Sequence, residues 1–91
     1  MRIRLEDIRF FNVRGEEITV GDKDFLIANN IHLYGSVRLD GIGAKLYKEK
    51  EVEVTNEQLD EIKHIIANSE IIHFAKSTIL KYLNSLTEAQ N

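Results

Sequence analysis

Strand-like patterning dominates the first 20 residues. Apolar residues, most of them β-branched or aromatic, occupy these positions: Ile3, Leu5, Ile8, Phe10, Phe11, Val13, Ile18 and Val20. Such residues favour β-strands. Arg14 and Gly15 lie between two apolar runs, and glycine at a tight turn can adopt the positive φ that hairpin turns need. The pattern therefore predicts a β-hairpin over residues 2–20.

The register of this hairpin depends on the length of its loop. A two-residue loop pairs Val13 with Glu16 and Phe11 with Ile18. Phe11, Val13 and Ile18 then share one face of the hairpin, because side chains alternate with a period of two. The alternation slips near residues 6–7, so a β-bulge is expected there.

Helical spacing replaces the strand pattern after residue 20. Apolar residues that recur three and four positions apart predict helices over roughly 23–34, 38–48, 55–68 and 70–86. Asp22 and Ser69 precede the first and the last of these helices, and both are residue types that cap helix N-termini. Gly41 and Gly43 each cost the second helix about 1 kcal/mol relative to alanine. We interpret these glycines as an adjustment of the backbone at the start of that helix.

Residues 51–58 carry the clearest local signals. Thr55-Asn56-Glu57-Gln58 is a capping-box sequence, in which the threonine caps the helix and the glutamine reaches back to it. The preceding Glu-Val-Glu-Val of residues 51–54 alternates like a short third strand at an edge beside the hairpin. Together the elements predict an α+β fold. We expect one compact domain over residues 1–91, with the hairpin packed against three or four helices.

Composition narrows the class of protein without identifying a chemistry. Apolar residues make up 43% of the chain and charged residues 30%, as in ordinary soluble domains. Cysteine is absent, which excludes disulfides, thiolate metal sites and a cysteine nucleophile. No window approaches the roughly 18 apolar residues of a membrane span, and acidic residues follow where a signal peptide needs an apolar core. We therefore expect a cytoplasmic protein that is not inserted in a membrane.

Charge is distributed unevenly along the chain. The net charge is −3, and all the arginines lie within the first 38 residues: Arg2, Arg4, Arg9, Arg14 and Arg38. Arginines on a hairpin can contact phosphate groups, which is the basis of a nucleic-acid-binding interpretation. The alternative is that they form the solvated, edge-protecting face of a strand. Because the net charge is negative and no basic recognition helix is present, we favour the second interpretation.

Two histidines have the spacing of a metal site. Glu61-x-x-His64 and Glu70-x-x-His73 repeat the motif of di-iron carboxylate bundles. A bundle site requires both motifs to point inward. At about 100° per residue, however, both pairs point away from the apolar faces of their helices. We therefore expect surface histidines beside solvated glutamates and no bound metal.

No other motif indicates catalysis or a cofactor. Gly41-Ile42-Gly43 lacks the third glycine and the preceding strand of a dinucleotide-binding fingerprint, and no P-loop lysine follows. None of the four serines lies in a nucleophile-elbow sequence. The prediction is a protein without catalytic residues or a cofactor.

The last predicted helix, 70–86, has more apolar residues than one buried face requires. Its apolar positions cover far more than half of the helix circumference, whereas packing on a single core needs a stripe of somewhat over 100°. We therefore expect Ile72, Leu80 and Leu83 to form an interface with another protein or with a second copy in a C₂ homodimer. The alternative is a central helix that the other elements cover completely.

The order of elements, together with three segments, carries an overall resemblance to known sequences. These segments are 46–48, 52–58 and 79–84, which read Leu-Tyr-Lys, Val-Glu-Val-Thr-Asn-Glu-Gln and Ile-Leu-Lys-Tyr-Leu-Asn. Across most of its length, the chain resembles small uncharacterised proteins encoded in bacterial prophages. This resemblance implies a phage or prophage accessory protein. We therefore expect a non-enzymatic interaction or assembly module, with a small nucleic-acid-binding regulator that uses the arginine-bearing hairpin as the alternative.

Overall fold

The protein has the predicted α+β architecture. The computed structural model describes residues 1–88. Its elements follow in this order: β1 (Arg2–Arg4), the 3₁₀ turn η1 (Leu5–Asp7), β2 (Phe10–Phe11), β3 (Glu17–Ile18), α1 (Lys23–Tyr34), the 3₁₀ turn η2 (Val37–Leu39), α2 (Ile42–Glu49), β4 (Glu51–Glu53), α3 (Asn56–Ala67) and α4 (His73–Glu88). Within these residues, no helix combines the length and the apolar character that crossing a bilayer requires.

The predicted hairpin over residues 2–20 is wrong as a single unit. β1 pairs with β4, about 50 residues away, in an antiparallel ribbon with Ile3 opposite Val52, and only β2 and β3 form a hairpin. The 3₁₀ turn η1 separates β1 from β2, at the place where a bulge was expected. Leu5 and Ile8 are both buried. Their spacing of three suits a 3₁₀ turn, whereas a strand would point these two side chains to opposite faces.

The hairpin of β2 and β3 also differs from the predicted register by one residue. Phe10 lies opposite Ile18, and Phe11 lies opposite Glu17. A one-residue shift sends every side chain to the other face. Phe10 is therefore buried in the core, while Phe11 is half exposed on the opposite face of the hairpin.

Asn12 explains this shift. Its side-chain Oδ1 accepts the backbone N–H groups of Arg14 and Glu16 at 2.9 and 3.0 Å. Asparagine commonly forms such turns with its own backbone. The loop therefore contains three residues instead of two, and Gly15 closes it with a φ of +84°. Val13 stands at the tip of the loop and is 103% exposed.

The helices match the predictions closely where their signals are local. α1 covers the expected residues, although Asp22 makes no side-chain capping bond. α3 begins with the predicted capping box, because Thr55 Oγ1 accepts the Gln58 N–H at 3.2 Å and Gln58 Oε1 accepts the Thr55 N–H at 2.9 Å. α4 begins at residue 73 instead of 70. Ser69 donates its hydroxyl to the Ile66 carbonyl at 2.7 Å, and this contact ties it to the end of α3.

The helix predicted over 38–48 is divided. The first residues of the predicted helix belong to the 3₁₀ turn η2. The α-helix α2 starts only at Ile42, after Gly41, which adopts a φ of +79°. Gly41 therefore marks the adjusted helix start. Gly43 has another function that the sequence analysis missed: it is the point at which α2 meets α1. A Cβ at this position would lie 2.6 Å from the Ala28 carbonyl oxygen and 2.7 Å from the His32 nitrogen.

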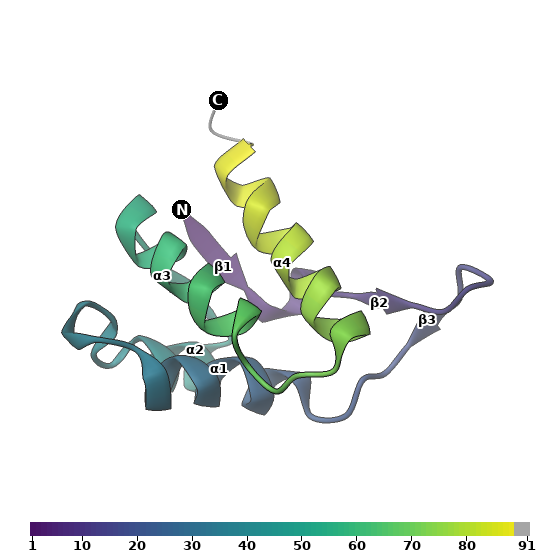
Figure 1. Ribbon diagram of the computed structural model, residues 1–91, viewed down its shortest axis with the longest axis horizontal. Coiled ribbons are helices and arrows are strands. Elements are labelled where there is room, and N and C mark those ends of the chain that lie inside the picture. Colours follow the sequence, from purple (N-terminus) through teal and green to yellow (C-terminus); the bar gives the residue numbers. More distant parts are fainter. Residues whose placement is uncertain (89–91) are drawn as a thin grey trace.

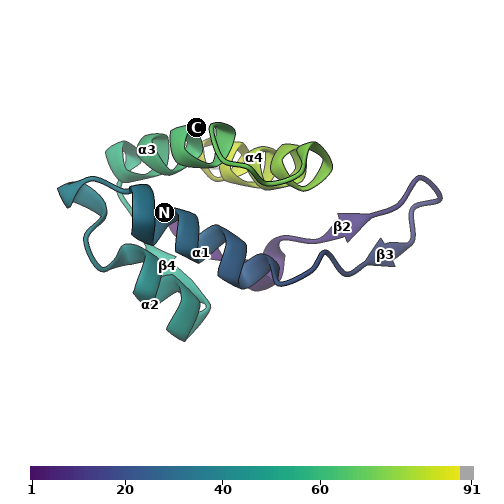
Figure 2. The same ribbon diagram turned by 60° about the horizontal axis from the view of Figure 1, so that its bottom comes forward.

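The elements pack around one core. α3 and α4 lie side by side, α1 packs on α2 and α3, and α4 covers β1 (Figures 1 and 2). Buried apolar residues come from every one of these elements. The hairpin of β2 and β3 extends away from the helices at one end of the molecule (Figures 1 and 2). We call this hairpin, residues 10–18, the arm.

Candidate interaction surface

Only part of the predicted interface on the last helix is accessible. Ile72, just before α4, is 63% exposed. Leu80 is half-buried and packs on the core, while Leu83 is only 2% exposed. Leu83 is therefore a core residue, and its assignment to an interface is wrong. The reason is that α4 packs against both β1 and α3, so a wider sector of the helix is covered than one packing partner would cover.

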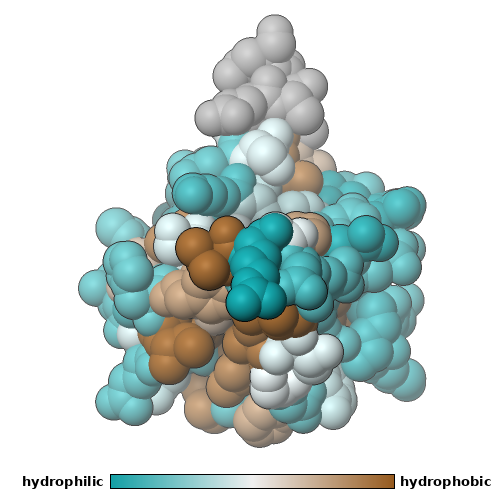
Figure 3. All heavy atoms as spheres, turned by 90° about the vertical axis from the view of Figure 1, so that its right-hand side faces the viewer, coloured by the Kyte–Doolittle hydropathy of each residue, from teal (hydrophilic) through white to brown (hydrophobic). Residues whose placement is uncertain are grey.

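The exposed apolar residues gather instead where the arm leaves the body. The Phe10 ring, at the base of the arm, lies 6.0 Å from the Phe74 ring in the first turn of α4. Ile18, opposite Phe10, and Phe74 itself remain partly exposed. Figure 3 looks onto this end of the molecule and shows hydrophobic residues gathered around a polar protrusion. Arm and α4 together therefore present an apolar surface to solvent.

A groove continues this surface along α1. It has a volume of about 1070 Å³ and lies between α1 and the corner that joins α3 to α4. Leu26, Leu33 and Tyr34 form one wall, and Ile65 and Ile72 belong to the other. Polar residues complete its lining: Asn29, Asn30, His64, Asn68, Ser69 and Glu70.

The arm and the groove are adjacent. Val20 and Gly21, which follow the arm directly, line the near end of the groove. We define the arm–groove surface by its exposed large apolar residues: Val13, Ile18, Leu26, Leu33, Tyr34, Ile72 and Phe74. Sequence reasoning missed the α1 part of this surface. The signal was available, because α1 also carries apolar residues on more than one face, as the last helix does.

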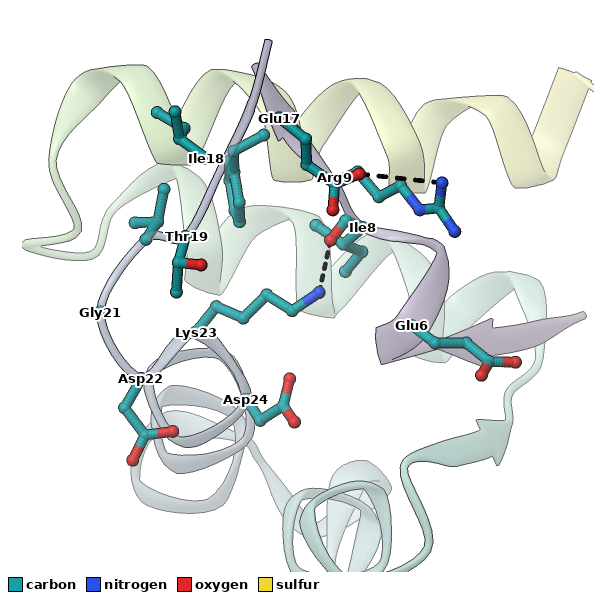
Figure 4. Close-up of a pocket in the computed structure, with 12 residues that line it drawn as sticks. Glu6, Ile8, Arg9, Glu17, Ile18, Thr19, Gly21, Asp22, Lys23 and Asp24 are labelled. Carbon is teal, nitrogen blue, oxygen red and sulfur yellow. Dashed lines mark hydrogen bonds and ion pairs between the residues drawn. The ribbon is translucent and has the colours of Figure 1, made fainter. Parts of the chain in front are cut away.

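A separate, polar pocket lies at the other side of the arm base. It has a volume of about 400 Å³. Lys23 crosses it and donates to the carbonyl of Leu5 at 2.8 Å and to the carbonyl of Ile8, so its ammonium group holds η1 in place (Figure 4). Glu6 and Asp22 point in different directions (Figure 4). These two carboxylates therefore do not converge on one point, and the lysine of the pocket is engaged in holding η1.

The residues of the two metal-like motifs do not form one site. Glu61 accepts the Ser36 N–H at 2.7 Å and the Ser36 hydroxyl at 2.8 Å, which ties α3 to the start of η2. These hydrogen bonds, the backbone one foremost, hold the pKa of Glu61 below its usual value. His64 and Glu70 line the groove, and His73 begins α4. Within residues 1–88, no three histidine, aspartate or glutamate side chains are placed to hold a metal ion.

The two arginines of β1 are engaged in ion pairs. Arg2 lies 3.6 Å from Glu51 and 3.3 Å from Glu53, and Arg4 lies 3.3 Å from Glu51. These pairs form a ladder across β1 and β4 on the exposed face of the ribbon. A hydrogen bond from the N-terminal amine, then the charge of that amine and the charge of Arg2, lower the pKa of Glu53. The arginines of β1 and the glutamates of β4, which are far apart in the sequence, thus pair with each other.

Comparisons with protein-family models, with curated proteins and with solved structures find no match to this chain. Geometry and surface chemistry are therefore the basis for a functional assignment.

Proposed function

We propose that this protein is a non-enzymatic interaction module that binds a protein chain through the arm–groove surface. The observation that carries the proposal is that the apolar base of the arm, the start of α4 and the groove adjoin one another: the Phe10 and Phe74 rings lie 6.0 Å apart, and Val20 and Ile72 line the groove. Contiguous apolar patches of this kind mark interaction sites on soluble proteins. Aromatic anchors with a polar rim are also typical of protein interfaces.

The context of the module follows from the resemblance to prophage-type proteins, which favours an accessory or assembly role. A regulator that binds nucleic acid receives less support. Arg2 lies within ion-pair distance of Glu51 and Glu53, and Arg4 within ion-pair distance of Glu51, so a phosphate group would compete with these carboxylates for both arginines.

Site-specific photo-crosslinking tests the proposal. A photoreactive phenylalanine analogue is placed at Ile72, within the surface, and in a second variant at Val37, an exposed valine outside it. Both variants are irradiated in cells that express the protein. We expect a covalent adduct with a protein chain from position 72 and none from position 37. Adducts from neither position, or equal adducts from both, would contradict the proposal.

A further inference from the structure

We infer that the chain which fills the groove is the arm of a second copy, in a reciprocal C₂ dimer. This inference rests on the proposed function and names its partner. The molecule presents a projecting apolar element, the arm, and a concave apolar element, the groove, and neither is covered by another segment of residues 1–88. A C₂ interface uses the same surface patch of both copies, so the arm of each copy would contact the groove of the other.

The positions of the two elements suit this symmetry. The groove starts at Val20 and Gly21, directly after the arm of the same chain. A twofold axis beside this junction places each arm over the groove of the other copy. Val13 at the tip is fully exposed, and it would meet the apolar wall formed by Leu26 and Leu33.

Charges at the tip and on the groove wall are complementary. Arg14 lies next to Val13 in the loop of the arm, and it makes no ion pair within residues 1–88. Glu70, on the groove wall, is likewise without an ion-pair partner in that part of the chain. An arm seated in the partner's groove would bring the guanidinium to this carboxylate, where a charge-assisted hydrogen bond can form.

The exposed apolar area is close to that of a standard interface. With about 150–200 Å² for a fully exposed large side chain, the exposed fractions of the arm–groove residues correspond to on the order of 600–800 Å² per copy. A standard protein interface buries about 800 Å² per partner. The whole chain exposes 5968 Å², so a dimer of this kind would use a usual share of the surface.

Two aspartate substitutions test the arm and the groove separately. Val13→Asp changes the tip of the arm and Leu33→Asp changes the groove wall, whereas Val37→Asp alters an exposed valine outside both. Sedimentation velocity over a hundredfold concentration range should show a monomer–dimer equilibrium for the wild type and for Val37→Asp. We expect Val13→Asp and Leu33→Asp to raise the dimer dissociation constant at least ~30-fold. Circular dichroism checks that each variant is folded.

Charge reversal tests the pairing itself and remains informative if an aspartate variant fails to fold. Arg14→Glu and Glu70→Arg should each weaken the dimer, and the double variant should recover most of the lost affinity. A wild type that is monomeric throughout, or a dimer that neither Val13→Asp nor the charge reversals weaken, would overturn the inference. If the photoreactive residue at position 72 then captures a different protein, the proposed function stands and only the identity of its partner is wrong. If it captures nothing, both fail.

Discussion

Gly43 offers a direct test of the close contact between α1 and α2. A Cβ at this position would lie 2.6 Å from the Ala28 oxygen, 2.7 Å from the His32 nitrogen and 2.9 Å from the His32 Cα. Non-bonded carbon atoms reach optimal contact only at about 3.5–4.0 Å. All three obstacles are backbone atoms of α1, so no side-chain rotation relieves the overlap. Gly43→Ala must therefore push α2 away from α1.

Two opposing contributions decide the stability of this variant. Alanine in a helix is favoured over glycine by up to about 1 kcal/mol. Overpacking of a tight contact costs about 1–3 kcal/mol, and rigid backbone obstacles argue for the upper end of that range. We expect Gly43→Ala to lower the free energy of unfolding by about 2 kcal/mol. This loss is large for a domain whose total stability is on the order of 5–15 kcal/mol.

Urea unfolding of the variant and of a matched control measures this balance. Ala44→Gly, at an exposed position of the same helix, reports the backbone propensity alone and should destabilise by up to about 1 kcal/mol. If Gly43 were an ordinary helix residue, Gly43→Ala would stabilise the protein by a similar amount. Stabilisation, or no change, would therefore refute the close approach of α1 and α2. If the dependence of the unfolding free energy on urea concentration is the same for all variants, a shift in midpoint reports a change in stability.

Three further variants test individual hydrogen bonds. Thr55→Ala removes the hydroxyl that accepts the Gln58 N–H at 3.2 Å; urea unfolding should report a loss of about 1 kcal/mol, and an unchanged midpoint and slope would contradict the capping interaction. Glu61→Gln should reduce the loss of stability on acidification. Because hydrogen bonds from Ser36 lower the pKa of Glu61 in the folded chain, its contribution is present above the usual value of 4.5 and disappears as the pH falls through the lowered pKa. Melting temperatures measured from pH 7 to pH 3 should therefore fall less steeply for this variant, and parallel profiles would refute the argument. Tyr82→Phe removes the hydroxyl that accepts a β1 backbone N–H at 2.9 Å, and denaturant unfolding should show a loss of about 1 kcal/mol; equal stability would show that water replaces the phenol.

Local signals predicted local structure well. α1 was expected over 23–34 and runs over Lys23–Tyr34. The capping box at Thr55 and Gln58 forms both of its hydrogen bonds. Helix periodicity and capping depend on residues within about four positions of each other, so the sequence contains nearly all of the relevant interactions. For the same reason, the predicted class of fold was correct although the strands were paired wrongly.

The candidate surface was predictable only in part. An excess of apolar residues on the last helix pointed to Ile72, which is exposed, yet it also selected Leu83, which lies in the core. Helical periodicity says how many faces are apolar, but it does not say how many neighbours cover them. That number is set by the simultaneous packing of α4 on β1 and α3.

Pairing between distant segments was decided by the tertiary structure alone. β1 pairs with β4 and not with the nearer β2. This ribbon is stabilised by the burial of Ile3 and Val52 on one face and by the Arg–Glu ion pairs on the other. Nothing in the neighbourhood of residue 3 identifies a partner about 50 positions away. Local sequence accounts for where α1 and α3 begin and for the capping box of α3. Packing determined which strands meet, why Gly43 must lack a side chain, and which apolar residues remain at the surface, because these depend on contacts that exist only when the whole chain is folded.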